Sequence, residues 1–233
     1  MTINLKNFLS SNKKTSKMGD FQEVKDIEGL QVSAVSADLY KNGRDDLSIF
    51  YFPEGANHAI AYTKSSIVSE SITWNRKNTK NNIKALVVNT KNANTFTGEQ
   101  GLNSLDEIAK DLVESLKKVE IENDYEKTKF KEILFASTGV IGEKFPLEKI
   151  KASIPNLISN LRPNQNKLIW LKVASAIMTT DTKPKVAYSE IKFGDKIVRL
   201  AGIAKGSGMI APNLATMFSF IFTAVSYTHL RAH

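Results

Sequence analysis

A glycine-rich block near the end of the chain places the tightest limits on its fold. Residues 205–217 spell KGSGMIAPNLATM, and an apolar, β-branched and aromatic run over residues 217–225 follows directly. The two glycines permit positive φ, Pro212 fixes one φ and Asn213 tolerates turn geometry, so the backbone can bend sharply before the run. The pattern predicts a constrained loop that enters a strand at Thr216, a common position for a nucleophile on a rigid scaffold.

A threonine hydroxyl is a weak nucleophile unless a base lies beside it. Cutting the chain before Thr216 would supply one, because the freed α-amino group has a pKa of roughly 7.7 to 8.0. Ala215 suits such a cut, since a small residue lets the Thr216 hydroxyl reach the preceding carbonyl carbon. A cut between Ala215 and Thr216 is therefore one way in which this sequence could provide the base.

The whole block resembles the self-cleavage segment of the ornithine acetyltransferase (glutamate N-acetyltransferase) family, usually written KGSGMIxPNMATML. Only Leu214 and Phe218 depart from that pattern, and both are apolar replacements beside the predicted nucleophile. The alternative is a glycine-rich loop ahead of a buried strand, which would explain the three residues GSG alone.

A second segment, STGVIG at residues 137–142, resembles the family's oxyanion-hole segment. The resemblance implies that the Thr138 hydroxyl and the Gly139 backbone N–H stabilise the oxyanion that forms when Thr216 attacks an acetyl amide. A plain exit from a strand into a turn is the alternative.

Two further residues are expected to bind substrate. MTTDT at residues 178–182 resembles a family segment whose first threonine contacts substrate, which maps to Thr179, although Thr and Asp at a helix end are also ordinary capping residues. Lys205 matches a substrate-binding lysine, and its ammonium could pair with the carboxylate of an N-acetylated amino acid. A solvated surface lysine is the alternative.

Residues 89–101 resemble the family segment NSGNANACTGxxG, with Thr90 and Lys91 in place of Ser and Gly. The asparagines either bind substrate or hydrogen-bond their own backbone turns, and the sequence does not separate the two.

The resemblance implies an N-terminal-nucleophile-like enzyme that moves an acetyl group from N-acetylornithine to glutamate through acetyl-Thr216, in arginine biosynthesis. It implies α and β chains from one precursor, assembled as a heterotetramer with two of each. Some members also use acetyl-CoA as a co-substrate, and the sequence leaves this open. Two alternatives are a related self-processing aminopeptidase, which hydrolyses the acyl-enzyme, and a non-enzymatic basic binding module.

Composition narrows the remaining functions. The 233 residues are 42% hydrophobic and include no cysteine, which excludes disulfides and thiolate metal sites. His58, His229 and His233 form no ligand spacing, and no nucleotide-binding motif appears, so neither a metal nor another bound cofactor is expected. No run reaches the roughly 18 apolar residues of a membrane span, which predicts a cytoplasmic protein without a membrane partner.

The net charge of +8 comes from lysines scattered among acids. We therefore expect no nucleic-acid partner, although the charge can draw in anionic carboxylate substrates.

The chain is expected to be an α/β protein with stacked β-sheets flanked by helices. Strands are predicted at residues 30–37, 47–52, 58–63, 83–89, 132–136, 186–193, 196–204 and 217–225. Helices are predicted at residues 104–118, starting at a Ser104–Glu107 capping box, at 146–161 and at 168–178.

Four segments follow from this organisation. Residues 1–20 form a polar lead-in, 21–215 an α-chain-like domain, 216–225 the start of a β-chain, and 226–233 a tail that does not resemble the family. Because family members carry a substantial subunit after the nucleophile, we expect a truncated sequence that lacks the downstream substrate-binding residues.

Overall fold

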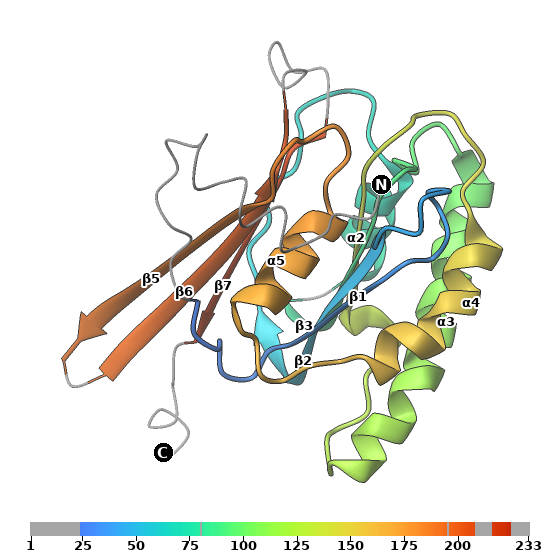
Figure 1. Ribbon diagram of the computed structural model, residues 1–233. Helices are drawn as coiled ribbons and strands as arrows, with labels where there is room; N and C mark the ends of the chain where they lie inside the picture. Colours follow the sequence, from blue (N-terminus) through green and yellow to red (C-terminus); the bar gives the residue numbers. More distant parts are fainter. Residues whose placement is uncertain (1–23, 80, 195, 208–215, 225–233) are drawn as a thin grey trace.

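The computed structural model describes residues 24–79, 81–194, 196–207 and 216–224. It contains a four-stranded and a three-stranded sheet that lie face to face, with helices on the far side of the larger sheet (Figure 1). This arrangement confirms the predicted α/β fold of stacked sheets flanked by helices. The predicted lead-in at 1–20 and tail at 226–233 lie outside the described residues.

The larger sheet has the strand order β1–β2–β3–β4. Its strands are β1 (Gln31–Val35), β2 (Leu47–Asn57), β3 (Asn82–Asn89) and β4 (Ile133–Ser137). β1, β2 and β3 pair antiparallel, whereas β3 and β4 are parallel. Parallel neighbours need a crossover, and α3 (Gly98–Glu122) supplies it.

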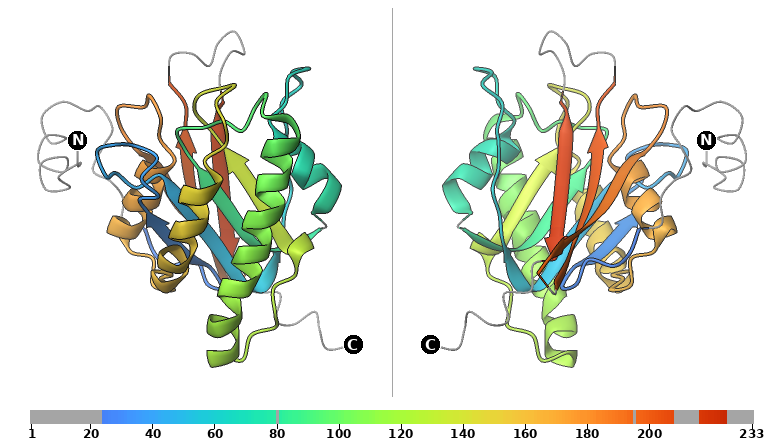
Figure 2. Two further views of the ribbon diagram at one scale, coloured as in Figure 1. Left: turned by 90° about the vertical axis from the view of Figure 1, so that its right-hand side faces the viewer. Right: turned by 90° about the vertical axis from the view of Figure 1, so that its left-hand side faces the viewer.

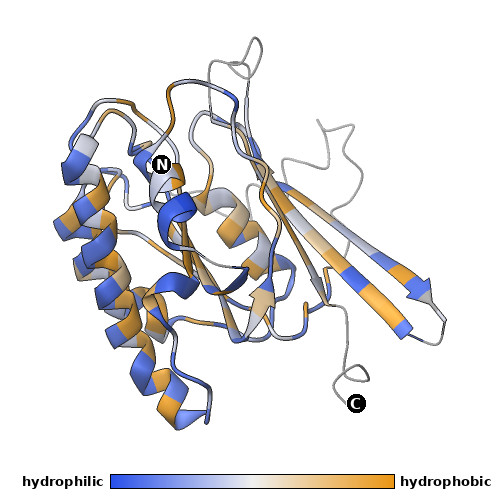
Figure 3. Cartoon of the chain, turned by 180° about the vertical axis from the view of Figure 1, so that it is seen from behind, coloured by the Kyte–Doolittle hydropathy of each residue, from blue (hydrophilic) through white to orange (hydrophobic). Residues whose placement is uncertain are grey.

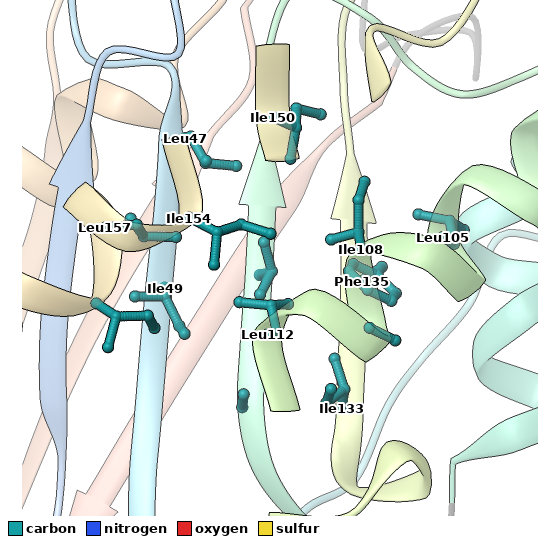
Figure 4. Packing of buried hydrophobic residues seen from close by; sticks show 14 of the residues in the cluster. Leu47, Ile49, Leu105, Ile108, Leu112, Ile133, Phe135, Ile150, Ile154 and Leu157 are labelled. Atoms are coloured by element: carbon teal, nitrogen blue, oxygen red, sulfur yellow. The ribbon is translucent and has the colours of Figure 1, made fainter. Parts of the chain in front are cut away.

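One hydrophobic core lies between this sheet and the helices α2 (Glu70–Asn78), α3 and α4 (Leu147–Ser159). Apolar residues repeat at helical spacing along α3, so one of its faces is buried and the other is hydrophilic (Figure 3). Leu105, Ile108 and Leu112 of α3 meet Ile49 of β2 and Phe135 of β4 in this layer (Figure 4).

A second core joins the two sheets. The smaller sheet has the order β5 (Lys185–Phe193), β6 (Lys196–Lys205) and β7 (Phe218–Ala224), all antiparallel. Phe50 of β2 stacks on Phe222 of β7 with ring centroids 4.8 Å apart. α5 (Lys167–Ala176) contacts both sheets, and its Trp170 lies against Phe222. In the described part of the chain no helix covers the outer face of β5–β7 (Figure 2).

Most predicted elements are present, and three differences have physical causes. The predicted strand at 58–63 is wrong: β2 instead continues to Asn57, through a register irregularity between Tyr51 and Ala56 that accommodates Pro53. Helix α2 was not predicted, because its only large buried side chain is Trp74.

The predicted helix start at Ser104 is also wrong, because α3 begins six residues earlier at Gly98. The carboxylate of Glu70, from α2, accepts hydrogen bonds from the Thr97 and Gly98 N–H groups, at 3.2 and 2.9 Å. The helix is therefore capped from another element rather than by its own Ser104, whose hydroxyl donates to the carbonyl oxygen of Gln100 inside the helix.

Both edges of the larger sheet are occupied. At β4, the side chain of Asn75 from α2 donates to the Phe135 carbonyl oxygen (2.8 Å) and accepts from the Phe135 N–H (2.9 Å), as a neighbouring strand would. At β1, Val32 and Arg162 exchange two backbone hydrogen bonds. The backbone polar groups of Phe135 and Val32, one residue on each edge strand, are thus satisfied within the chain.

Candidate active site

Predicted site residues gather where strands of both sheets end. Thr138 and Gly139 follow β4, Lys205 is the last residue of β6, and Thr216 lies two residues before β7. Lys205 pairs with Phe218 in the antiparallel β6–β7 ladder, so the loop that begins after Lys205 returns to the same end of the sheet.

The Lys205 side chain links two of these segments. Its Nζ donates hydrogen bonds to Thr138 Oγ1 (3.0 Å) and to the carbonyl oxygen of Thr216 (3.1 Å). Lys205 is 5% exposed and Thr138 is 1% exposed, so this contact is shielded from solvent, and the solvated-surface interpretation of Lys205 is wrong. The structure thereby places Thr138, Lys205 and Thr216 in one cluster.

The ammonium of Lys205 lies in an unusual electrostatic setting. Burial lowers the pKa of Lys205 below its ordinary value, the negative charge of Asp181 opposes that change, and the positive charge of Lys185 adds to it. A cation held here against neutral oxygen atoms is well suited to stabilising negative charge that develops next to Thr138.

Gly139 adopts a conformation that suits a backbone donor. Its φ is +137°, and a Cβ placed on it would lie 2.3 Å from the carbonyl carbon of Lys91 and 2.7 Å from the backbone nitrogen of Asn92. Only glycine fits so close to another backbone segment. Gly139 is exposed, and within the described ranges its N–H has no hydrogen-bond acceptor, so that donor is free for a ligand.

Thr179 is half-buried at the exit of α5, and it joins the cluster only indirectly. Its backbone N–H donates a long hydrogen bond of 3.5 Å to Asp181 Oδ2, and Asp181 Oδ1 accepts from the backbone N–H of Gly206 at 2.8 Å. Burial raises the pKa of Asp181, but the hydrogen bonds from Lys185 and Gly206 outweigh it and hold that pKa below its ordinary value. Sequence reasoning missed Asp181, although it lies inside the MTTDT segment.

The asparagine-rich loop after β3 bonds mainly to backbone. The amide of Asn89 donates to the Asn92 carbonyl oxygen, that of Asn92 to the Glu143 carbonyl oxygen, and that of Asn94 to the Gly101 carbonyl oxygen. All three side chains are buried. These contacts support the turn-stabilising interpretation over direct substrate binding, and they hold the backbone against which Gly139 packs.

One predicted site residue cannot be placed: Ala215, on the acyl side of the predicted cut, is outside the described residues. Across residues 24–79, 81–194, 196–207 and 216–224, no group of three His, Cys, Asp or Glu side chains is arranged to hold a metal ion, and no helix is long and apolar enough to cross a membrane. A cavity of 530 Å³ that Arg199, Tyr125 and Glu54 help to line includes none of the predicted site residues.

The fold and the site together define a class of protein: an α/β protein with stacked sheets, in which a threonine at the start of a strand lies beside a buried lysine and a glycine donor. Comparison with known proteins makes this specific. The model of the ArgJ family matches residues 31–232, and the chain belongs to the ArgJ family.

Individual relatives also carry the ArgJ name. The chain is 38% identical over 198 residues to the arginine biosynthesis bifunctional protein ArgJ of Gluconobacter oxydans, an alignment that covers 84% of this chain and 43% of the relative. The protein of the same name from Bartonella quintana is 38% identical over 203 residues, covering 87% of this chain and 46% of the relative. The chain therefore spans less than half the length of these curated relatives.

Solved structures show the same fold. A crystal structure of the arginine biosynthesis bifunctional protein ArgJ from Bacillus halodurans aligns with a TM-score of 0.65 at 22% identity, covering 84% of this chain and 98% of that chain. Ornithine acetyltransferase from Mycobacterium tuberculosis, solved in complex with ornithine, aligns with a TM-score of 0.68 at 22% identity, covering 84% and 99%.

Proposed function

We propose that this chain is the upstream part of a self-cleaving acetyltransferase that moves an acetyl group from N-acetylornithine to glutamate in arginine biosynthesis. The observation that carries the proposal is the buried Lys205 ammonium, which donates hydrogen bonds to both the buried Thr138 side chain and the Thr216 backbone. Membership of the ArgJ family and the names of its bifunctional relatives support the same activity.

Self-cleavage starts when the Thr216 hydroxyl attacks the carbonyl carbon of Ala215. The peptide C–N bond breaks as the new ester bond forms, and the hydroxyl proton passes to the departing nitrogen, which becomes the Thr216 α-amine. Water then hydrolyses the ester and leaves a carboxylate on Ala215. The part of the chain that ends at Ala215, which includes the α-chain-like domain at residues 21–215, becomes the α-chain, and Thr216 becomes the first residue of the β-chain.

In acetyl transfer, the α-amine takes the proton of the Thr216 hydroxyl as its oxygen attacks the acetyl carbonyl of N-acetylornithine. The Gly139 N–H and the Thr138 hydroxyl stabilise the resulting oxyanion, with the Lys205 charge behind that hydroxyl. Ornithine leaves with the proton. The amine of glutamate then attacks acetyl-Thr216, the ester C–O bond breaks, a proton from that amine returns to the Thr216 oxygen, and N-acetylglutamate leaves. Thr179 and Lys205 contact the substrate, and Lys205 pairs with its carboxylate.

The remaining parts of the proposal concern the complete protein. Two α and two β chains assemble into a cytoplasmic heterotetramer, and no bound cofactor is required. Whether acetyl-CoA also serves as a donor is decided by assaying glutamate acetylation with acetyl-CoA in place of N-acetylornithine.

Intact mass spectrometry of the protein extended to the length of its relatives tests the proposal. We expect two chains divided before Thr216, acetyl-Thr216 after addition of N-acetylornithine, and neither product from Thr216→Ala. Acetyl transfer to glutamate rather than to water distinguishes the transferase from an aminopeptidase. A single uncut chain that still transfers acetyl groups at full rate would refute the scheme.

A further inference from the structure

The carboxylate of Asp181 bonds to Gly206, the residue that follows Lys205 of the cluster of Thr138, Lys205 and Thr216. Its side chain is fully buried, and it forms an ion pair with Lys185, the first residue of β5. Neither residue has a role in the chemistry described above. A buried carboxylate needs hydrogen-bond donors to offset its desolvation, so the identity of those donors is informative.

Asp181 and Lys185 both form hydrogen bonds with the backbone of Gly206, in the glycine-rich block. Asp181 Oδ1 accepts from the Gly206 N–H at 2.8 Å, and Lys185 Nζ donates to the Gly206 carbonyl oxygen at 2.9 Å. Both backbone polar groups of Gly206 are therefore held by an oppositely charged pair. Hydrogen bonds that involve a charged partner are shorter and roughly twice as strong as neutral ones.

Gly206 directly follows Lys205, so holding Gly206 also fixes the backbone from which the Lys205 side chain reaches Thr138 and Thr216. We infer that Asp181 and Lys185 act as a positioning pair, which sets the start of the self-cleavage loop and the direction of the Lys205 ammonium. This inference rests on the proposed function. Among the described residues, neither side chain forms a hydrogen bond with Thr138, Gly139 or Thr216.

The pair also acts on Lys205 through charge. The described groups whose charges act on Lys205 are Asp181, in the segment after α5, and Lys185 on β5, while Thr138 and the Thr216 carbonyl contribute neutral oxygens. Asp181 raises the pKa of Lys205 and Lys185 lowers it. Removing one charge therefore shifts the deprotonation of Lys205 in the opposite direction from removing the other.

The test uses Asp181→Asn and Lys185→Met in the protein extended to the length of its relatives. Self-cleavage is followed by intact mass and acetyl transfer across a pH series. We expect Asp181→Asn to slow both reactions by about 10- to 100-fold, because small misplacements of site groups carry losses of that size. We also expect the alkaline limb of its pH profile to move to lower pH, and that of Lys185→Met to move to higher pH.

Asp111→Asn is the matched control. It removes a carboxylate from a partly exposed ion pair with Lys151, on the helical side of the larger sheet, and both reactions and the pH profile should remain unchanged. A role confined to folding would lower stability without moving the alkaline limbs in opposite directions.

The outcomes separate the two proposals. If the wild-type chain neither cleaves nor transfers acetyl groups, the proposed function fails, and the inference with it. If the wild type is active and Asp181→Asn matches it in rate and pH profile, only the positioning pair is refuted. If Asp181→Asn does not fold, the pH profile of Lys185→Met tests the inference instead. An alkaline limb of that variant that stays in place or moves to lower pH overturns the inference.

Discussion

Replacing Gly139 by alanine should destabilise the protein far more than the same change at Gly142, three residues along the same loop. Both glycines have positive φ, +137° and +80°, so each alanine incurs backbone strain of about 1 to 2 kcal/mol. A Cβ at Gly142 meets nothing within 4 Å, whereas one at Gly139 falls 2.3 Å from the Lys91 carbonyl carbon.

That neighbouring backbone cannot move freely. The Lys91 carbonyl oxygen accepts from the Val140 N–H, and the Ala93 N–H donates to the Val140 carbonyl oxygen, both at 2.9 Å. Relieving the overlap strains these bonds, so overpacking adds about 1 to 3 kcal/mol to the strain. We expect a total loss of about 2 to 5 kcal/mol for Gly139→Ala and about 1 to 2 kcal/mol for Gly142→Ala.

Urea unfolding of both variants against the wild type measures this difference. For a chain of this size, the expected losses of unfolding free energy correspond to a drop in melting temperature of about 10 °C for Gly139→Ala and only a few degrees for Gly142→Ala. Equal losses at the two positions would refute the argument that the Lys91 backbone demands a glycine at 139.

Three further predictions concern stability. Asn75→Ala leaves both backbone groups of Phe135 unpaired, so urea unfolding should show a loss of about 2 to 4 kcal/mol, whereas Asn123→Ala, at an exposed helix end, should lose under about 1 kcal/mol. Tyr51→Phe removes a donor from the buried Glu120 carboxylate (3.1 Å), so its melting temperature should fall by an amount equivalent to about 1 to 3 kcal/mol, and an unchanged value would contradict the contact. Because the pKa of Asp181 is lowered on folding, its stabilisation is present above about pH 4 and is lost as pH falls through the folded-state pKa. Asp181→Asn should therefore lose less stability than the wild type between about pH 6 and pH 3, and a parallel loss in the two proteins would contradict this sign.

Local sequence patterns predicted the elements that depend on nearby residues. The β5–β6 hairpin follows from two apolar strands around a glycine turn, and α4 follows from its helical spacing despite Pro155 within it. The start of α3 could not be predicted in this way, because its donors are satisfied by Glu70, which lies 28 residues before Gly98 in the sequence.

In the site, too, local motifs could be predicted, whereas contacts between distant segments could not. The segments that contain Thr138, Lys205 and Thr216 were predicted from motifs, but the burial of Lys205 depends on β4 meeting the end of β6, which no local pattern encodes. Asp181 was missed for the same reason: its partner Gly206 lies 25 residues away, and a threonine–aspartate run at a helix end has an ordinary local explanation.

The contacts at the two edges of the larger sheet affect where further strands can be added. Asn75 substitutes for a missing neighbour on one side and Arg162 on the other, so a fifth strand would have to displace contacts that are already made. Strand addition at either edge, whether from more of the same polypeptide or from another molecule, would therefore lose the bonds that Asn75 and Arg162 already make.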